Sequence, residues 1–232
     1  ITGGKQIVCE NWRNLVAVGA KPLAITNCLN FGNPENKEIM GEFAECLEGI
    51  KEACEFLDFP VVSGNVSFYN GTNKKNIFPT PVIGGVGLIT KLVKPLNHKF
   101  KSEKSILILI GNTNGHLEQS CFLKENYSII DGKPPEVNLL NEKNNGEIVL
   151  NLISSNLVLS AHDVSSGGLL VALSEMAISS DMGVKIEKPK KLKNLFEYFF
   201  GEDQGRYILE IDKKNINKVE KILKNTDIYY EI

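Results

Sequence analysis

The sequence predicts an α/β protein with α+β character, in which helices pack in layers on a sheet, and it predicts two domains. Three observations support this class. Short apolar runs typical of strands alternate with longer stretches in which apolar residues recur every three or four positions. The chain has 232 residues, of which 42% are hydrophobic, so it can bury a sizeable core. A basic and polar passage at 91–104 separates the predicted domains, 1–92 and 104–232.

The first predicted domain alternates helices with strands. Its second helix has the strongest pattern, because its apolar residues form one stripe at spacings of three and four and Pro60 follows the stripe. A polar turn separates its last two strands. The expected elements are a helix at 5–18, a strand at 22–30, a helix at 40–57, a strand at 61–68 and a strand at 82–89.

The second predicted domain opens with a short continuous apolar strand and a turn-rich loop of glycine, asparagine and threonine. Strands and helices then alternate to the end of the sequence, which predicts helices packed on a sheet. The expected elements are strands at 106–110, 157–161, 206–211 and 228–230, helices at 119–124, 167–178 and 213–223, and one more helix that ends near 156.

The composition excludes several classes of protein. Lys and Arg number 26 against 28 Asp and Glu, so the net charge of −2 gives no general attraction to nucleic acid or to an anionic membrane. No apolar run reaches the roughly 18–20 residues that cross a bilayer, and the N-terminus lacks the features of a signal peptide. The five cysteines show no C-x-x-C spacing, which predicts reduced thiols in the cytoplasm rather than disulfides or a zinc site.

Three segments rich in glycine or asparagine are predicted at the ends of strands, where α/β proteins bind ligands. The first contains Asn27, Asn30 and Asn33. An amide side chain is costly to bury unless it is hydrogen-bonded, so these residues need partners on the backbone or on a ligand. The alternative interpretation is turn chemistry, because Gly-Asn-Pro suits a bend and asparagine caps helices.

In the second segment, Gly64 and Asn65 interrupt a predicted strand. A glycine in a strand marks a bulge or a place where a ligand comes close to the backbone. Phosphate oxygens would then reach peptide N–H groups at Gly64, and the amide oxygen of Asn65 is a hard ligand suited to magnesium. The alternative is an ordinary β-bulge without a ligand.

The third segment, 160–169, is predicted to pass from a strand into a helix. Asp163, Ser165 or Ser166 is expected to cap that helix, and the glycines that follow would let an anion approach its N-terminus. His162 has no evident base or nucleophile beside it, so we expect a structural role for this histidine.

Seven motifs, in order along nearly the whole chain, resemble the small form of the large subunit of formylglycinamide ribonucleotide amidotransferase. This family is also called phosphoribosylformylglycinamidine synthase subunit II and belongs to the aminoimidazole ribonucleotide synthetase superfamily. Seven ordered motifs are far more specific than any one of them. The motifs are Gly-Gly-Lys-Gln at 3–6, Trp-Arg-Asn-Leu at 12–15, Asn-Cys-Leu-Asn-Phe-Gly-Asn-Pro at 27–34, Gly-Asn-Val-Ser-Phe-Tyr-Asn at 64–70, Pro-Thr-Pro-Val-Ile-Gly-Gly-Val-Gly at 79–87, His-Asp-Val-Ser at 162–165 and Phe-Gly-Glu-Asp-Gln-Gly-Arg-Tyr at 200–207.

The resemblance implies a fold and a reaction. Subunits of this family resemble two aminoimidazole ribonucleotide synthetase-like units in tandem, each with an N-terminal and a C-terminal domain, and this chain matches the second unit. We therefore expect the chain to be cut short at both ends, and to be inactive without the missing N-terminal half. The implied enzyme uses ATP and magnesium to phosphorylate the formamide oxygen of formylglycinamide ribonucleotide, and ammonia then displaces phosphate. A separate glutaminase subunit would supply the ammonia, and a third, small subunit would assist assembly.

The resemblance also implies roles for four residues at matching positions. Asn27 and Gly64 are expected to contact ATP, Asn65 to bind magnesium and Ser67 to contact the ribonucleotide substrate. The family's proton-accepting histidine lies in the first half, so no catalytic residue is expected in this chain.

Two residues depart from the family's pattern. Glu118 stands where family members usually have glycine, which places a carboxylate near a loop that would otherwise approach phosphate. Ser166 stands where they usually have aspartate, which affects only a helix cap or an outer contact.

Two alternative functions stay open. One is a related enzyme of the superfamily, such as aminoimidazole ribonucleotide synthetase or thiamine-monophosphate kinase, although the run at 27–34 speaks against both. The other is a non-catalytic structural half that holds an auxiliary nucleotide and supports the catalytic half.

Overall fold

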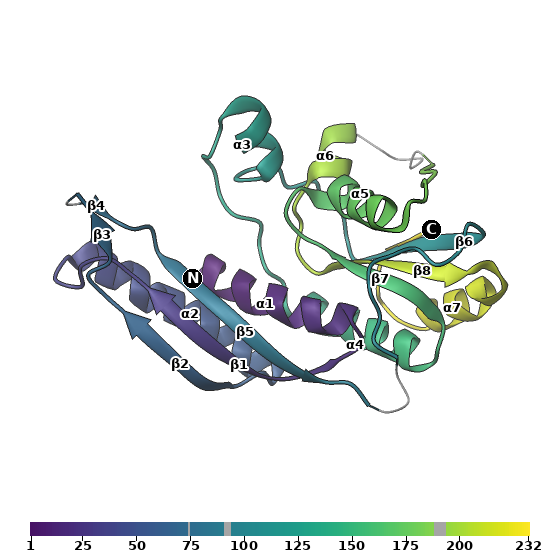
Figure 1. The fold of residues 1–232 in the computed structure, drawn as a ribbon, viewed down its shortest axis with the longest axis horizontal. Coiled ribbons are helices and arrows are strands. Elements are labelled where there is room, and N and C mark those ends of the chain that lie inside the picture. Colours follow the sequence, from purple (N-terminus) through teal and green to yellow (C-terminus); the bar gives the residue numbers. More distant parts are fainter. Residues whose placement is uncertain (74, 91–93, 188–193) are drawn as a thin grey trace. The chain divides into compact units, whose positions relative to one another are not determined.

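The computed structural model of the protein describes residues 1–73, 75–90, 94–187 and 194–232 (Figure 1). The chain forms two compact units. Unit 1 comprises Ile1–Leu15 and Lys21–Leu88, and unit 2 comprises Val16–Ala20 and Ile89–Ile232. The expected end of the first domain, residue 92, lies outside the described residues.

Unit 1 contains a three-stranded sheet, two long helices and a short hairpin. The helices and strands expected in this part of the sequence are confirmed, and the hairpin is an addition to them. The elements are α1 (Thr2–Ala17, whose end belongs to unit 2), β1 (Lys21–Asn30), α2 (Lys37–Leu57), β2 (Val61–Ser67), β3 (Gly71–Thr72), β4 (Lys75–Asn76) and β5 (Thr80–Leu88).

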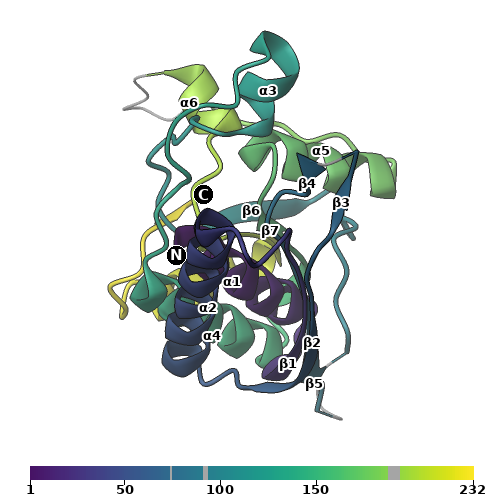
Figure 2. The same ribbon diagram turned by 90° about the vertical axis from the view of Figure 1, so that its left-hand side faces the viewer.

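The sheet of unit 1 has the strand order β2-β1-β5. β1 pairs with β2 in parallel and with β5 antiparallel. α2 joins the two parallel strands, because parallel neighbours need a crossover that returns the chain to the same end of the sheet. Figure 2 shows α1 and α2 on the same side of this sheet.

α2 forms where the sequence pattern and the caps agree. The side chain of Asn36 accepts a hydrogen bond from the Glu38 N–H at 2.9 Å, and the helix ends at Asp58, which adopts the left-handed conformation. Its buried residues are Ile39, Cys46, Gly49, Ile50, Ala53, Cys54 and Leu57, and Gly49 lies against the start of α1. Burial of these residues is what holds the helix in place, since propensity alone stabilises an isolated helix weakly.

The side of the sheet away from the helices is exposed, and we call it the open face. Along β5 the exposure alternates from one residue to the next, as expected for a strand with one covered side. Val82 and Val86 on the open face are 52% and 59% exposed, whereas Ile25 and Leu29 on the helix-facing side of β1 are 0% and 1% exposed. Large apolar side chains that gather on one surface mark a place for a binding partner.

Unit 2 contains a four-stranded sheet with helices on both sides. The expected elements are confirmed in type, β7 extends further than predicted, and α6 is an addition. The elements are β6 (Ser105–Ile110), α3 (Cys121–Tyr127), α4 (Leu139–Ser154), β7 (Val158–Val164), α5 (Gly168–Ser180), α6 (Leu195–Phe200), β8 (Arg206–Asp212), η1 (Lys213–Asn215), α7 (Ile216–Leu223) and β9 (Tyr230–Glu231).

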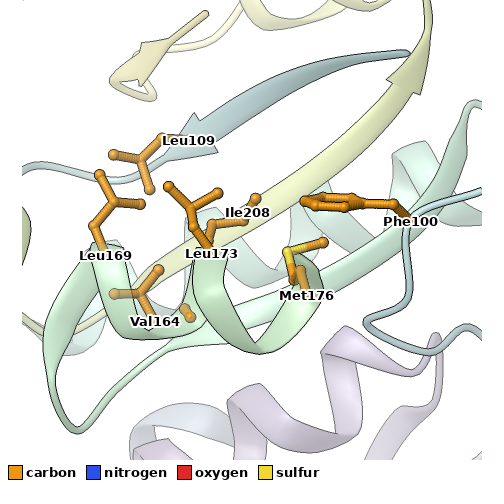
Figure 3. Close-up of a cluster of buried hydrophobic side chains, with 8 residues drawn as sticks. Phe100, Leu109, Val164, Leu169, Leu173, Met176 and Ile208 are labelled. Carbon is orange, nitrogen blue, oxygen red and sulfur yellow. The ribbon is translucent and has the colours of Figure 1, made fainter. Parts of the chain in front are cut away.

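The sheet of unit 2 has the order β7-β8-β6-β9, and all its neighbours are antiparallel. α5 covers one side, and α4 and α7 lie on the other (Figure 1). β8 is therefore buried on both faces from Arg206 to Ile211. Figure 3 shows the core beneath α5, where Leu169, Leu173 and Met176 of the helix pack on Ile208 of β8. The whole chain thus mixes a parallel pair in unit 1 with an antiparallel sheet in unit 2, as the predicted class allows.

A cluster of ionisable side chains connects β7 to α5 within unit 2. His162 lies in β7, and its Nδ1 is 3.3 Å from Oδ1 of Asp163 and its Nε2 is 3.0 Å from Oε2 of Glu175. The ring of His98 lies beside it, with the ring centroids 5.2 Å apart. Burial lowers the pKa of His162, but hydrogen bonds and charge from Asp163 and Glu175 raise it more, so the pKa lies above its ordinary value. Burial and the neighbouring His162 lower the pKa of His98. The expectation that no base lies beside His162 is therefore wrong, and its structural role stays a prediction.

No helix among the described residues is both long enough and apolar enough to cross a membrane. All five cysteines are free thiols.

The His162 contact predicts a dependence of stability on pH. Because the folded protein raises the pKa of His162, the contact stabilises fully below the unfolded value of about 6.5 and is lost as the pH rises through the raised folded value. The wild type should have a higher free energy of unfolding than His162→Gln, and this difference should be larger at pH 6 than at pH 9. Urea denaturation at both pH values measures it. Glu175→Gln should reduce the same difference, and an advantage that stays constant from pH 6 to pH 9 would contradict the assignment.

Candidate functional site

The four residues with expected ligand roles lie on two neighbouring strands of unit 1. Asn27 is in β1, and Gly64, Asn65 and Ser67 are in β2. The parallel register pairs Asn27 with Gly64, Cys28 with Asn65 and Asn30 with Ser67. These residues sit within strands, as the predicted strands at 22–30 and 61–68 led us to expect, and the two polar segments continue past the ends of β1 and β2.

The strand pairing places the four residues on opposite sides of the sheet. Residues paired across neighbouring strands point to the same side, and successive residues along a strand point to opposite sides. Asn27 and Gly64 therefore lie on the helix-facing side, with the buried Ile25 and Leu29. Asn65 and Ser67 lie on the open face. The structure thus brings the four residues together along the strands but does not place their side chains on one surface.

The side chain of Asn27 occupies the space that a side chain at Gly64 would fill. A Cβ atom at Gly64 would overlap Oδ1 of Asn27. β2 is continuous through Gly64 and Asn65. Its pairing with β1, all of it within the described residues, has one register shift, which falls between Ile25 and Thr26. The alternative of a β-bulge at Gly64 is therefore wrong, and the glycine makes room for the Asn27 amide.

A cavity of about 700 Å³ adjoins Asn27 on the helix-facing side of unit 1. Its wall is formed by the C-terminal half of α2 and by the chain from Asp58 to Val61. Apolar atoms of Leu47, Ile50 and Cys54 line it, and charged groups of α2 stand at the same wall. Burial raises the pKa of the Cys54 thiol to about 11, so this thiol is protonated at neutral pH.

The C-terminal ends of β1 and β2 are joined by the side chain of Asn70. Its Nδ2 donates to the carbonyl oxygens of Phe31 and Ser67, both at 3.0 Å. Its amide also lies beside the Ser67 hydroxyl, with Oδ1 at 3.3 Å and Nδ2 at 3.1 Å from Oγ. Asn70 is not among the residues with expected ligand roles, although its spacing of three from Ser67 is typical of local side-chain contacts.

The other asparagines of the first segment have protein partners. Asn30 Nδ2 lies 3.4 Å from the carbonyl oxygens of Cys28 and Thr80, and Asn33 Oδ1 accepts from the Glu35 N–H at 2.9 Å. Asn76 of β4 accepts a hydrogen bond from the Asn33 N–H at 2.9 Å. Turn and strand-end chemistry therefore accounts for Asn30 and Asn33, and a ligand is not needed to satisfy them.

Asn65 differs from these asparagines because it is exposed on the open face, and its side chain makes no hydrogen bond to any described residue. The described part of the chain holds no group of three or more His, Cys, Asp or Glu side chains able to hold a metal ion. Asn65 can therefore supply one neutral oxygen to a cation, and the remaining ligands would come from water and from an anionic ligand such as a phosphate. The residue suits magnesium that arrives with a phosphate, not a metal site formed by protein alone.

In unit 2 the third polar segment is held by Glu202. Its Oε1 accepts hydrogen bonds from the Gly167 N–H at 2.8 Å and from the Cys121 N–H at 2.7 Å. Gly167 is the N-cap of α5, and no side chain caps the helix there. The expected caps Asp163, Ser165 and Ser166 are therefore wrong, because a carboxylate from a distant part of the sequence occupies that position. An anion that approached this N-terminus would meet the negative charge of Glu202.

A second carboxylate, Asp203, holds the glycine-rich loop after β6. Its oxygens accept from the N–H groups of Asn114 at 2.9 Å, Gly115 at 2.8 Å and His116 at 3.3 Å. Asp203 is buried, and a buried carboxyl group is costly unless it is hydrogen-bonded in this way. The backbone amides of this loop therefore already bind a carboxylate of the protein itself.

Glu118, which departs from the pattern of the resembled family, is also engaged with the backbone. Its Oε2 accepts from the Lys133 N–H at 2.6 Å. Gly132 adopts a φ of +104°, and a Cβ atom there would lie 2.7 Å from Cβ of Glu118. Glu118 thus stabilises a tight turn in the loop between α3 and α4.

Two family models match the chain. The model described as AIR synthase related protein, N-terminal domain, matches residues 1–89, and the model described as AIR synthase related protein, C-terminal domain, matches residues 104–232.

Similar proteins agree with these matches. Phosphoribosylformylglycinamidine synthase subunit PurL of Pelagibacter ubique is 55% identical over 231 residues, which cover 100% of this chain and 32% of that relative. Two solved structures, T. maritima PurL complexed with ATP and T. maritima PurL complexed with FGAR, each have a TM-score of 0.72 and 18% identity. The first match covers 99% of this chain and 36% of the other, and the second covers 100% and 38%. The structural likeness shows a shared fold, and this chain spans about a third of the length of these relatives.

The contact between Asn27 and Gly64 predicts the effect of a methyl group. Gly64→Ala should lower the free energy of unfolding by about 1–3 kcal/mol, because the new atom overlaps the Asn27 amide. Gly64→Ala combined with Asn27→Ser should recover part of the loss. The fluorescence of Trp12, the only tryptophan, reports on unit 1 during urea denaturation.

The matched control is Gly41→Ala in α2, where a Cβ atom meets nothing within 4 Å. This change should stabilise by up to about 1 kcal/mol, because alanine favours a helix over glycine. Equal losses for Gly64→Ala with and without Asn27→Ser would show that the Asn27 amide is not the reason for the glycine.

The Asp203 contacts predict a loss of order in the loop of residues 111–116. Asp203→Asn replaces one accepting oxygen by a donor that faces backbone N–H groups, so unit 2 should lose about 2–4 kcal/mol. Amide hydrogen exchange at residues 114–116 should accelerate, as mass spectrometry can measure. The exposed Asp131→Asn should change stability by no more than about 0.5 kcal/mol, and similar exchange in both variants would disprove the role of Asp203.

Proposed function

The chain belongs to the AIR synthase related protein family through both of its domains, and from this we propose that it is part of an ATP-dependent carbon–nitrogen ligase of purine biosynthesis. The reaction is that of phosphoribosylformylglycinamidine synthase. Formylglycinamide ribonucleotide, ATP and glutamine-derived ammonia give formylglycinamidine ribonucleotide, ADP and phosphate. The observation that carries the proposal is the 55% identity, along all of this chain, to a relative named for this reaction.

We assign the nucleotide to Asn27 and Gly64. The amide of Asn27 lies at the wall of the cavity beside α2, and it carries both a donor and an acceptor for a polar ligand. Gly64 lies on β2, which is an edge strand of the sheet, so a ligand can reach its backbone from outside. One of the similar solved structures is T. maritima PurL complexed with ATP, which supports this class of ligand.

We assign magnesium to Asn65 and the ribonucleotide substrate to Ser67. The exposed amide oxygen of Asn65 provides one hard ligand, which fits a cation that also binds phosphate oxygens. A magnesium ion bound there would neutralise negative charge on the phosphates. Ser67 lies two positions further on the same face of β2, so a substrate that touches it lies beside the same phosphates. FGAR is named as the bound molecule of a second T. maritima PurL structure.

A ligand that contacts all four residues must pass around the edge of the sheet. Asn27 and Gly64 face the helix side, and Asn65 and Ser67 face the open side. β2 has no neighbour on its outer edge among the described strands, and its residues are exposed from Val61 to Val66. We therefore propose that the nucleotide lies across this edge and that its phosphates reach the open face.

The open face also supports a protein partner. Its exposed apolar residues on β5, together with the length of the relatives, fit a second unit of similar fold from the same polypeptide, the N-terminal half. We further propose a glutaminase subunit that supplies ammonia and a small subunit that assists assembly. A cytoplasmic setting, in which thiols stay reduced, suits the five free cysteines.

One observation favours a second candidate, a non-catalytic half that holds an auxiliary nucleotide. On the open face, the positions around Asn65 and Ser67 hold Thr26, Cys28, Asn30, Ser63, Thr80, Val82 and Gly84. This part of the face has no carboxylate, imidazole or ammonium group to act as a general acid or base. Proton transfer must therefore come from another part of the enzyme, or this unit serves stability alone.

The two candidates can be separated in a chimera in which this chain replaces the matching 231 residues of the Pelagibacter ubique relative. With ammonium and ATP, the chimera should produce ADP and the amidine. Asn65→Ala should lower kcat/KM by about 10- to 100-fold, as expected when a metal loses a supporting ligand. Ser63→Ala, on the same face of the same strand, should leave turnover unchanged.

The outcomes are distinct. A soluble chimera that never turns over would contradict the ligase function. Full turnover in Asn65→Ala with a lower melting temperature would instead identify a structural nucleotide site.

A further inference from the structure

We propose that Asn70 is a positioning residue that binds the hydroxyl proton of Ser67, so that Ser67 meets its ligand as a hydrogen-bond acceptor. This inference rests on the proposed function, because that function makes Ser67 a substrate contact. It adds the direction of the hydrogen bond, and with it the chemical groups of the substrate that Ser67 can recognise.

The orientation of the Asn70 amide is determined by its two carbonyl neighbours. Nδ2 lies 3.0 Å from the carbonyl oxygen of Phe31 and 3.0 Å from that of Ser67. If the amide were rotated by 180°, its own oxygen would face two acceptors and lose both hydrogen bonds. The nitrogen therefore points at the carbonyl groups, and Oδ1 points toward the Ser67 side chain.

The donors and acceptors around Asn70 then determine the direction of the Ser67 bond. An amide nitrogen carries two hydrogens, and the two carbonyl oxygens take both. The Ser67 Oγ also lies 3.1 Å from Nδ2, but no hydrogen is left for a full bond along that line. Oδ1, at 3.3 Å from Oγ, has free lone pairs and accepts the single hydroxyl proton of Ser67.

The backbone around Asn70 holds this arrangement rigid. The Asn70 N–H donates to the Phe31 carbonyl at 3.2 Å, and the Phe31 N–H donates to the Ser67 carbonyl at 3.0 Å. Tyr69, between the two polar residues, has a φ of 59°, which is the left-handed region, and its N–H binds the Gly32 carbonyl at 2.9 Å. Phe31 is completely buried. A rotation of the Asn70 amide would therefore break contacts that join the ends of β1 and β2.

With its proton bound, Ser67 can only accept. A phosphate near neutral pH carries mainly acceptor oxygens, so it is a poor partner for this hydroxyl. The groups that fit are donors, namely a ribose hydroxyl or an amide N–H. Formylglycinamide ribonucleotide carries both ribose hydroxyls and amide N–H groups, and each of these is a neutral hydrogen-bond donor. The phosphate of the substrate must then be held by other residues.

Substrate analogues test the direction of this bond in the wild-type chimera with the Pelagibacter ubique relative. One arm compares formylglycinamide ribonucleotide with its 2′-deoxy and 3′-deoxy forms, and the other with forms methylated at each amide nitrogen. In the wild type, one analogue should have a KM about 5- to 30-fold above that of the natural substrate, the range of a lost hydrogen bond. In Ser67→Ala, this analogue and the natural substrate should have similar KM values. If no analogue shows a penalty that depends on Ser67, the acceptor role is wrong.

Variants test the positioning role of Asn70. Asn70→Ala should raise KM for the ribonucleotide by about 5- to 30-fold and leave KM for ATP unchanged, and it should add little in a Ser67→Ala background. The matched control is Asn76→Ala, because Asn76 also holds the loop after β1 but does not contact Ser67. If Asn70→Ala does not fold, the analogue experiment still decides the acceptor role.

The results separate this inference from the proposed function. No effect of Ser67→Ala on KM for the ribonucleotide would remove Ser67 from the substrate site and would count against the function itself. A large effect of Ser67→Ala, together with equal effects of Asn70→Ala and Asn76→Ala on both KM values, would leave the site in place. It would show that Asn70 only stabilises the fold.

Discussion

The parallel pairing of β1 with β2 is the constraint on which the candidate site depends. It pairs Asn27 with Gly64 and Asn30 with Ser67, and the alternation of side chains along each strand then determines which face each residue occupies. A shift of one residue would exchange the two faces and expose buried apolar side chains. The pairing is held by the crossover helix α2 and by the Asn70 amide at the ends of the strands. The ligand positions that we propose therefore depend on the same contacts that stabilise the sheet.

The two units differ in whether carboxylates of the protein bind the backbone N–H groups near their loops and strand ends. In unit 2, Glu202 and Asp203 bind the amides at α3, at α5 and in the loop after β6. Those amides are positions where a phosphate would otherwise be expected, and the protein's own carboxylates occupy them. In unit 1, the exposed edge of β2 and the amide of Asn65 stay accessible. The ligand chemistry proposed for this chain is accordingly placed in unit 1.

Much of the fold was predictable from the sequence, because apolar periodicity indicates helices and strands directly. α2 shows this well, since its apolar stripe is buried, whereas β5 was recognised as an apolar run and alternates between exposed and half-buried residues. Contacts between distant residues gave no comparable signal. The N–H of Gly167, the N-cap of α5, donates to Glu202, which lies 35 positions further along the chain, whereas only nearby residues were expected at this helix end. The fit of Gly64 to Asn27 likewise depends on a strand register that one sequence does not reveal.

The central claim is that one nucleotide lies across the edge of β2, with Asn27 and Gly64 on one side and Asn65 on the other. The most direct test is a crystal structure of the chimera with a non-hydrolysable ATP analogue and magnesium. The account predicts nucleotide atoms within about 4 Å of the Asn27 amide and the Gly64 backbone, and a cation at Oδ1 of Asn65 that also binds phosphate oxygen. A nucleotide bound elsewhere, with only solvent at these three residues, would contradict it.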